Sequence, residues 1–125
     1  MFSLTKDDES IYFERSKSFS DEFYFLNKFS DFEAAQFINS KNIQILFNLN
    51  GYTASSMNEI FVHRPSPIQI QHMGYPGSMG ADFIDYFIGD KITIDEKSRK
   101  YYSESIIYMP HCYQANSYSE FNKDF

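Results

Sequence analysis

The sequence predicts an α/β protein built around a mostly parallel sheet, and three observations lead to this fold class. Short runs of β-branched and aromatic residues alternate with segments of helical character, in the order β-α-β-β-α-β. Capping residues mark the starts of two helices. All five glycines lie between residues 51 and 89, and three of the four prolines lie between 65 and 76. Tight backbone turns are therefore concentrated in the middle of the chain.

The first part of the chain contains two predicted helices and one strand. Acidic residues 7–9 are suited to the positive end of a helix, which we expect to reach about residue 17. A short aromatic run at 23–26 predicts a strand. Ser30 and Glu33 form a capping-box pattern, so a second helix is expected over residues 31–40.

The middle of the chain predicts strand, helix and strand. Residues 43–49 are β-rich and stop at a turn that contains Gly51. A second capping-box pattern predicts a helix over 56–63, where cationic residues meet the carbonyl end before Pro65 ends the helix. Residues 68–73 alternate in polarity and predict a strand that runs into a glycine-rich loop.

The last third predicts one more helix between two strands. After the glycine-rich loop, the apolar run 83–88 is flanked and interrupted by aspartates, which favours an edge or entrance strand over a catalytic dyad. Residues 95–102 predict a helix that begins with acidic residues. Residues 105–109 predict a final strand, which Pro110 ends.

Composition excludes several classes of protein. The net charge of −6 argues against a basic surface for nucleic acid, while 42% hydrophobic residues predict a packed core that includes most of the aromatic side chains. The longest apolar runs have four residues, far from the roughly twenty that a membrane span needs. The start shows no signal-peptide pattern, and the single Cys112 allows no internal disulfide. These features predict a cytoplasmic or nuclear protein.

Two loops are candidates for binding a ligand, because ligands of open parallel sheets gather beyond the carboxyl ends of strands. The first covers residues 48–53, where Gly51 permits close approach and Tyr52 offers a flat ring with a hydroxyl. The second covers Gly74–Gly80, whose three glycines leave main-chain donors accessible to a sugar or phosphate. This second spacing matches neither the dinucleotide fingerprint nor a P-loop, so an ordinary tight turn is the alternative.

The remaining reactive side chains form no recognisable site. His63, His72 and His111 have no metal-ligand spacing, and no metal or cofactor is expected. Of the three, His72 lies nearest the glycine-rich loop. Cys112 is interpreted as a small apolar residue without a catalytic role.

Four motifs occur in the order and spacing found in one enzyme family. Ile45–Thr53, Asn58–Phe61, Arg64–Gln69 and Met73–Gly77 together resemble the catalytic region of protein O-GlcNAc transferases. The similarity continues over nearly the whole chain, through shorter stretches at 3–8, 85–86, 101–103 and 109–111.

This resemblance implies a GT-B glycosyltransferase, with two Rossmann-like halves and an active site in the cleft between them. Residues 1–125 are then part of the N-terminal catalytic half, without the family's tetratricopeptide repeats and without the second half. The implied donor is UDP-GlcNAc, the acceptors are Ser and Thr hydroxyls of proteins, and the reaction needs no metal. Tyr52, Met73, Gly74 and Pro76 match residues that line the donor and acceptor pocket in the family.

Departures from the family pattern limit what carries over. Ala54 and Met57 stand where the family often has a Lys and an Arg that help to hold the acceptor peptide. The family's histidine-proline motif matches nothing here, and its UDP-anchoring lysine and aspartate belong to the second half, so no catalytic residue is assigned. We expect the isolated chain to be inactive. The related protein O-fucosyltransferases, which use a GDP-sugar, and a non-catalytic remnant are the alternatives.

Overall fold

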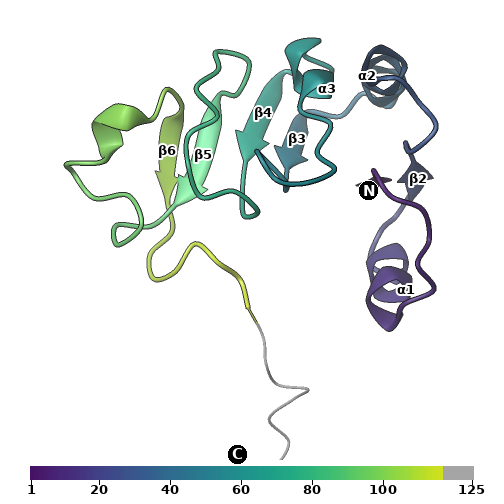
Figure 1. The fold of residues 1–125 in the computed structure, drawn as a ribbon, viewed down its shortest axis with the longest axis horizontal. Coiled ribbons are helices and arrows are strands. Elements are labelled where there is room, and N and C mark those ends of the chain that lie inside the picture. Colours follow the sequence, from purple (N-terminus) through teal and green to yellow (C-terminus); the bar gives the residue numbers. More distant parts are fainter. Residues whose placement is uncertain (117–125) are drawn as a thin grey trace, which may run out of the picture.

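A four-stranded sheet forms the centre of the computed structural model, which describes residues 1–116 (Figure 1). Its strands lie side by side in the order β3-β4-β5-β6, and all neighbouring strands are parallel. The prediction of a mostly parallel sheet is confirmed. The strand bounds are Ile45–Asn48 for β3, Ile68–Gln71 for β4, Tyr86–Gly89 for β5 and Ser105–Tyr108 for β6.

A second, two-stranded parallel sheet precedes the first one along the chain. Its strands are β1 (Phe2–Ser3), which the sequence analysis did not predict, and β2 (Tyr24–Phe25), which lies inside the predicted strand 23–26. Helix α1 (Ile11–Ser18) connects them. The two strands are short, and their pairing is supported by the stacking of the Phe2 and Tyr24 rings, with centroids 5.7 Å apart.

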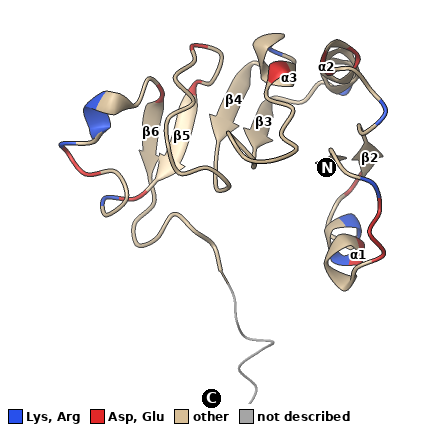
Figure 2. Cartoon of the chain, in the orientation of Figure 1, with Lys and Arg blue, Asp and Glu red and all other residues tan. Residues whose placement is uncertain are grey.

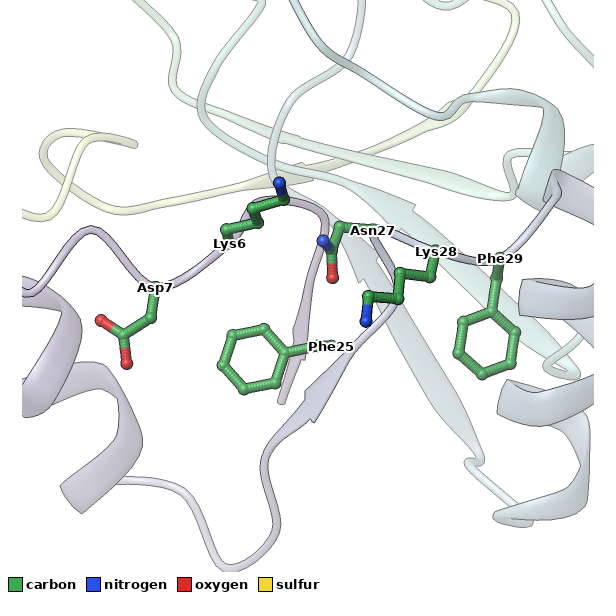
Figure 3. Close-up of a pocket in the computed structure, with 6 residues that line it drawn as sticks. All are labelled: Lys6, Asp7, Phe25, Asn27, Lys28 and Phe29. Atoms are coloured by element: carbon green, nitrogen blue, oxygen red, sulfur yellow. The ribbon is translucent and has the colours of Figure 1, made fainter.

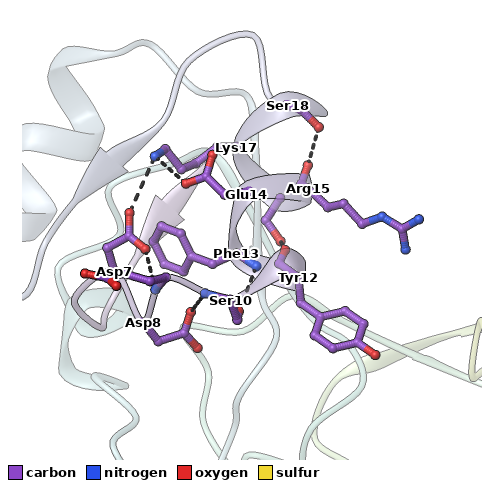
Figure 4. Close-up of polar contacts among 11 residues, drawn as sticks. Asp7, Asp8, Ser10, Tyr12, Phe13, Glu14, Arg15, Lys17 and Ser18 are labelled. Atoms are coloured by element: carbon purple, nitrogen blue, oxygen red, sulfur yellow. Dashed lines mark hydrogen bonds and ion pairs between the residues drawn. The ribbon is translucent and has the colours of Figure 1, made fainter.

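Helix α1 begins two residues after the acidic segment that was expected to open it. The side chains of Asp7 and Asp8 instead accept hydrogen bonds from the backbone amides two residues further on (Figure 4). This turn brings Ser10 to the N-cap, where its hydroxyl oxygen accepts from the Phe13 amide at 3.1 Å. The Ser10 hydrogen bonds hold the pKa of Asp8 below its usual value. The acids therefore organise the segment before the helix.

Helix α2 (Asp31–Ser40) confirms the first capping-box prediction. The Ser30 hydroxyl oxygen accepts from the Glu33 amide, and the Glu33 carboxylate accepts from the Ser30 amide at 2.9 Å. The same backbone hydrogen bond, followed by that from the hydroxyl, lowers the pKa of Glu33. Ala34 and Ile38 are buried in the hydrophobic core, and the helix packs against helix α3 (Glu59–Val62).

Helix α3 spans only Glu59–Val62, so the predicted capping box at 56–59 is wrong. Asn58 precedes the helix with helical backbone angles, and its side chain makes no cap. Its amide group is used in the loop after β3. Arg64 does not cap the helix end either, because its guanidinium contacts both carboxylate oxygens of Asp85 at 3.0 and 3.1 Å.

Two predictions for the last third are also wrong. The expected helix 95–102 is a turn followed by the short 3₁₀ helix η1 (Arg99–Tyr101), because Asp95 binds the amide and the hydroxyl of Ser98 and closes a tight turn. Strand β5 is not an edge strand. It lies between β4 and β6, and its Phe87 is completely buried.

The core lies between one face of the sheet and helices α2 and α3. Its buried members are Leu26, Ala34, Ala35, Ile38, Leu46, Ile60, Phe61, Met79 and Ile84. The strands of the larger sheet carry no charged residues (Figure 2). Within the described part of the chain, no helix has the length and hydrophobicity that crossing a membrane requires.

Candidate functional site

Two loops meet where β3 and β4 end. The first is residues 49–58, and the second is residues 72–80; we call them the β3 loop and the β4 loop. The Tyr52 hydroxyl donates a hydrogen bond of 2.7 Å to the Met79 carbonyl. The rings of Tyr52 and Tyr75 are in edge contact, with centroids 5.7 Å apart. Parallel strands thus bring together the two segments that the sequence marked as candidates.

Asn48, the last residue of β3, organises the β3 loop. Its side-chain oxygen accepts hydrogen bonds from the amides of Asn50 and Gly51, both at 3.1 Å. Its side-chain nitrogen donates to the Asn58 oxygen at 2.9 Å, and Asn58 in turn donates to the Gly51 carbonyl at 3.0 Å. Asn48 is only 5% exposed. Both ends of the loop are therefore held by one pair of side-chain amides, of which Asn48 is buried and Asn58 is partly buried.

Glycines allow the two loops to interlock. Gly51 has φ of +59°, and a Cβ atom there would lie 2.7 Å from Nε2 of Gln71 and 2.8 Å from Cβ of Tyr75. Gly74 has φ of +33°, and a Cβ atom there would overlap the backbone of the β3 loop, 2.5 Å from the Asn50 carbonyl oxygen. Packing between the two loops therefore requires glycine at both positions, whether or not a ligand binds.

The far end of the β4 loop is held by residues that precede β6. Glu104 is 1% exposed, and its carboxylate accepts from the Ser78 hydroxyl at 2.8 Å and from the Met79 amide at 2.6 Å. The Tyr102 hydroxyl donates to the Pro76 carbonyl at 2.8 Å. Burial, followed by the nearby charge of Glu104, raises the pKa of Tyr102. Tyr102 therefore stays protonated as a donor at neutral pH.

The start of the β4 loop presents main-chain donors. Among residues 1–116, the amides of Gly74, Tyr75 and Gly77 donate no hydrogen bond to the protein. Met73 precedes them with φ of +62°, a conformation that a residue with a side chain adopts only at a cost. A strained turn with free amides next to exposed tyrosine is suited to bind oxygen atoms of a polar ligand.

The four residues predicted from the family resemblance therefore lie in these two adjoining loops. Tyr52 is in the β3 loop and is 57% exposed, while Met73, Gly74 and Pro76 are in the β4 loop. Met57 packs against the core, where the family often has a basic residue. The geometry brings the four residues together, and their contact with a ligand stays a prediction.

Sequence reasoning missed the residues that support the loops. Asn48 could have been found, because an Asn side chain two residues before an Asn-Gly turn often binds the backbone amides that follow it. Glu104 and Tyr102 gave no signal, since they lie 25 or more positions from the backbone groups that they bind. His72 is turned to the C-terminal segment, where Nε2 contacts the Tyr113 carbonyl oxygen at 2.9 Å.

Another concavity lies at the carboxyl ends of β1 and β2, with a volume of about 480 Å³. Figure 3 shows Phe25 and Phe29 at its wall with Lys6, Asp7 and Lys28 around them. Nowhere in residues 1–116 do three or more His, Cys, Asp or Glu side chains lie close enough together to bind a metal ion.

Comparison with known proteins places the chain in a family. Residues 1–123 match the model of glycosyl transferase family 41. The chain is 39% identical over 123 residues to a probable UDP-N-acetylglucosamine–peptide N-acetylglucosaminyltransferase of Arabidopsis thaliana, covering 98% of the chain and 13% of that relative. It is 41% identical over 88 residues to the corresponding enzyme of Caenorhabditis elegans, covering 70% of the chain and 8% of the relative.

A solved structure shows the same fold. An O-GlcNAc transferase mutant from Thermobaculum terrenum superposes with a TM-score of 0.84 at 21% identity, over 90% of this chain and 21% of that one. The architecture is that of part of a GT-B half. Because the family model covers almost the whole sequence, the chain belongs to glycosyl transferase family 41.

Proposed function

We propose that these 125 residues form part of the N-terminal catalytic half of a protein O-GlcNAc transferase, and that the β3 and β4 loops line its donor and acceptor pocket. The donor is UDP-GlcNAc and the acceptors are Ser and Thr hydroxyls of proteins. Relatives with this activity in their names support the proposal. The chain spans about an eighth or less of their length, so the activity belongs to the longer assembly.

One observation in the structure carries the assignment of the pocket wall. Within residues 1–116, the amides of Gly74, Tyr75 and Gly77 in the β4 loop donate to no protein group, while buried groups fix the loop at its far end. Donors fixed before the ligand arrives need no reorganisation when it binds. They can therefore position hydroxyl or phosphate oxygens of a sugar nucleotide. The chain supplies orientation in this scheme, and we assign it no proton-transfer residue.

Three side chains outside the β4 loop hold it in one conformation. Glu104 and Tyr102 reach the loop from the segment before β6, and Tyr52 reaches it from the β3 loop. Losing the Glu104 or the Tyr102 contact changes the loop conformation without removing a proposed ligand contact, so these two are positioning residues. Tyr52 both supports the loop and lines the proposed pocket. The same pocket requires no metal in this proposal, and the unpaired Cys112 is compatible with a cytoplasmic or nuclear protein.

A segment exchange tests the proposal. The 125 residues replace the matching segment of the Arabidopsis relative, and GlcNAc transfer from UDP-GlcNAc to an acceptor peptide is measured. We expect transfer well above a buffer blank, and a tenfold or greater loss of kcat/KM with Tyr52→Phe, which removes the hydrogen bond to Met79. GDP-fucose serves as the competing donor. A folded chimera that uses GDP-fucose, or transfers nothing, would contradict the proposal.

A further inference from the structure

An open pocket lies where the loops that follow β1 and β2 come together (Figure 3). Its volume of about 480 Å³ is within the range of roughly 300–1,000 Å³ that is usual for ligand pockets. We call it the two-lysine pocket, and the residues that line it are Lys6, Asp7, Phe25, Asn27, Lys28 and Phe29. None of them belongs to the β3 or β4 loop, so the two-lysine pocket is distinct from the proposed transfer pocket.

The pairing of β1 with β2 brings the two lysines to the same end of the small sheet. Ser3 and Phe25, the last residues of the two strands, are partners in the parallel register. Lys6 follows Ser3 by three residues, and Lys28 likewise follows Phe25 by three residues. Because parallel strands end at the same edge, both lysines reach the rim of one pocket.

The aromatic wall of the pocket is held from behind by two helices. The Phe25 ring stacks on Phe13 of α1 with centroids 5.8 Å apart, and the Phe29 ring packs on Phe37 of α2 at 5.5 Å. Phe25 is nevertheless 40% exposed. A ligand ring can therefore pack on Phe25 while the protein side of the contact is already fixed.

The cations of the pocket are available to a ligand. Among residues 1–116, the amines of Lys6 and Lys28 make no hydrogen bond or ion pair with the protein. The acid in the lining, Asp7, lies 3.5 Å from the Lys17 amine and accepts a hydrogen bond from the Glu9 amide at 2.8 Å. Two such cations in a chain of net charge −6 favour an anionic ligand.

The combination of cations and rings selects among anions. A phosphate or a lone carboxylate would pair with the lysines and leave the aromatic wall unused. A peptide that carries an acidic and an aromatic residue uses both features. In an extended peptide, residues two positions apart lie on the same face, so they can enter the pocket together.

We propose that the two-lysine pocket docks an acidic segment of the acceptor protein. A carboxylate of this segment pairs with Lys6 and Lys28, and an aromatic ring two positions away packs on Phe25. The pocket lies near the β3 loop, because Thr5, directly before Lys6, lines a concavity of about 520 Å³ together with Asn50. A protein docked there has its neighbouring residues close to the transfer pocket. The identity of the partner as the acceptor rests on the proposed function, whereas the chemistry of the pocket does not.

A titration of the 125-residue chain with a labelled peptide tests the docking site. The probe is acetyl-Gly-Asp-Gly-Phe-Gly-Asp-Gly-amide, followed by fluorescence anisotropy at low ionic strength, because salt screens pairs between exposed charges. The double variant Lys6→Gln, Lys28→Gln should weaken binding at least fivefold. The matched control Lys91→Gln, Lys97→Gln removes the same charge from exposed residues outside the pocket and should change the affinity less than twofold. Probes with Asn for Asp, or Ala for Phe, should also bind at least fivefold more weakly.

Kinetics of the chimera with the Arabidopsis relative separate docking from transfer. One acceptor peptide carries the acidic segment of the probe beside its Ser, and a second acceptor lacks it. The Lys6→Gln, Lys28→Gln variant should raise KM for the first acceptor at least fivefold and leave its kcat unchanged. Both constants for the second acceptor should stay the same. If the unmodified chimera transfers to neither acceptor, the proposed function fails, and the titration of the chain still decides the docking site.

Four results would overturn the docking proposal. The first is equal probe affinity of the two double variants, or no saturable binding to the wild-type chain. The second is undiminished binding of the probe with Asn for Asp. The third is inorganic phosphate that competes as well as unlabelled probe, which would reduce the pocket to a simple anion site. The fourth is a dimer of the chain that dissociates in the Lys6→Gln, Lys28→Gln variant, which would assign the pocket to a second copy.

Discussion

At the scale of single residues, the site depends on contacts between backbone and side chain that join distant parts of the sequence. Asn48 shapes the β3 loop from within, while Glu104 fixes the β4 loop from 25 residues away. Family motifs in the sequence pointed to the four residues proposed to line the pocket, yet no motif pointed to Glu104. A lone acid before a strand has no local pattern, because its partners are set only by the fold.

Gly74 and Gly80 form a matched pair for testing the interlocked loops. Both have positive φ, so either change to alanine costs about 1–2 kcal/mol from backbone strain. Gly74→Ala also forces an overlap with the Asn50 backbone, which adds about 1–3 kcal/mol, whereas a Cβ atom on Gly80 meets nothing within 4 Å. We expect Gly74→Ala to lower the free energy of unfolding clearly more than Gly80→Ala. Equal losses in urea unfolding would disprove the packing role.

At the scale of elements, sequence patterns predicted a helix correctly where residues of the same segment form the hydrogen bonds that cap it. Helix α2 was predicted with correct bounds, because Ser30 and Glu33 are only three positions apart in the sequence and cap the helix together. The same pattern at 56–59 failed, since the fold uses Asn58 to hold the β3 loop. The expected helix at 95–102 failed because Asp95 closes a turn. In the first case a tertiary contact outweighed the helix propensity of the segment, and in the second case a local turn did.

The cap of α2 gives a prediction for pH dependence. Glu33 has a pKa below its usual value of 4.5, because the Ser30 amide and then its hydroxyl stabilise the carboxylate. A lowered folded-state pKa means that this stabilisation is complete above pH 4.5 and is lost as the pH falls through the folded-state pKa. The difference in unfolding free energy between wild type and Glu33→Gln should therefore be constant near neutral pH and shrink below pH 4.5.

Urea unfolding of both proteins from pH 7 to pH 3 measures this difference. The Ser30→Ala background is the control, because it removes the hydroxyl contribution and should reduce the pH dependence. If the difference in unfolding free energy between wild type and Glu33→Gln grows as the pH falls, the Glu33 carboxylate does not stabilise the folded state as argued.

At the scale of the whole molecule, the larger parallel sheet was predictable and the small sheet of β1 and β2 was not. Alternating strands and helices predicted the fold class, whereas β1 is too short to give a pattern of its own. The sheet also leaves one face open. Ile45, Phe47, Tyr86 and Ile107 share this face and are 37 to 46% exposed. These features fit a segment that completes its core with other parts of a larger catalytic region.

The isolated chain should show no transferase activity. The β3 and β4 loops are proposed to position a sugar nucleotide, but none of their residues is assigned to stabilise the charge developing on the departing diphosphate. Incubation of the purified chain with radiolabelled UDP-GlcNAc and an acceptor peptide should give incorporation equal to a buffer blank. The chimera with the Arabidopsis relative is the positive control. Incorporation above the blank by the chain alone would refute this expectation.

The central claim is that the β4 loop contacts the donor through its free amides. Hydrogen exchange of the chimera with and without saturating UDP-GlcNAc tests this claim most directly, because it reports on the amides of Gly74, Tyr75 and Gly77 individually. Exchange at these amides should slow at least tenfold with the donor, while the Met79 amide, already bound to Glu104, should change little. Donor binding that leaves all three loop amides unchanged would contradict it.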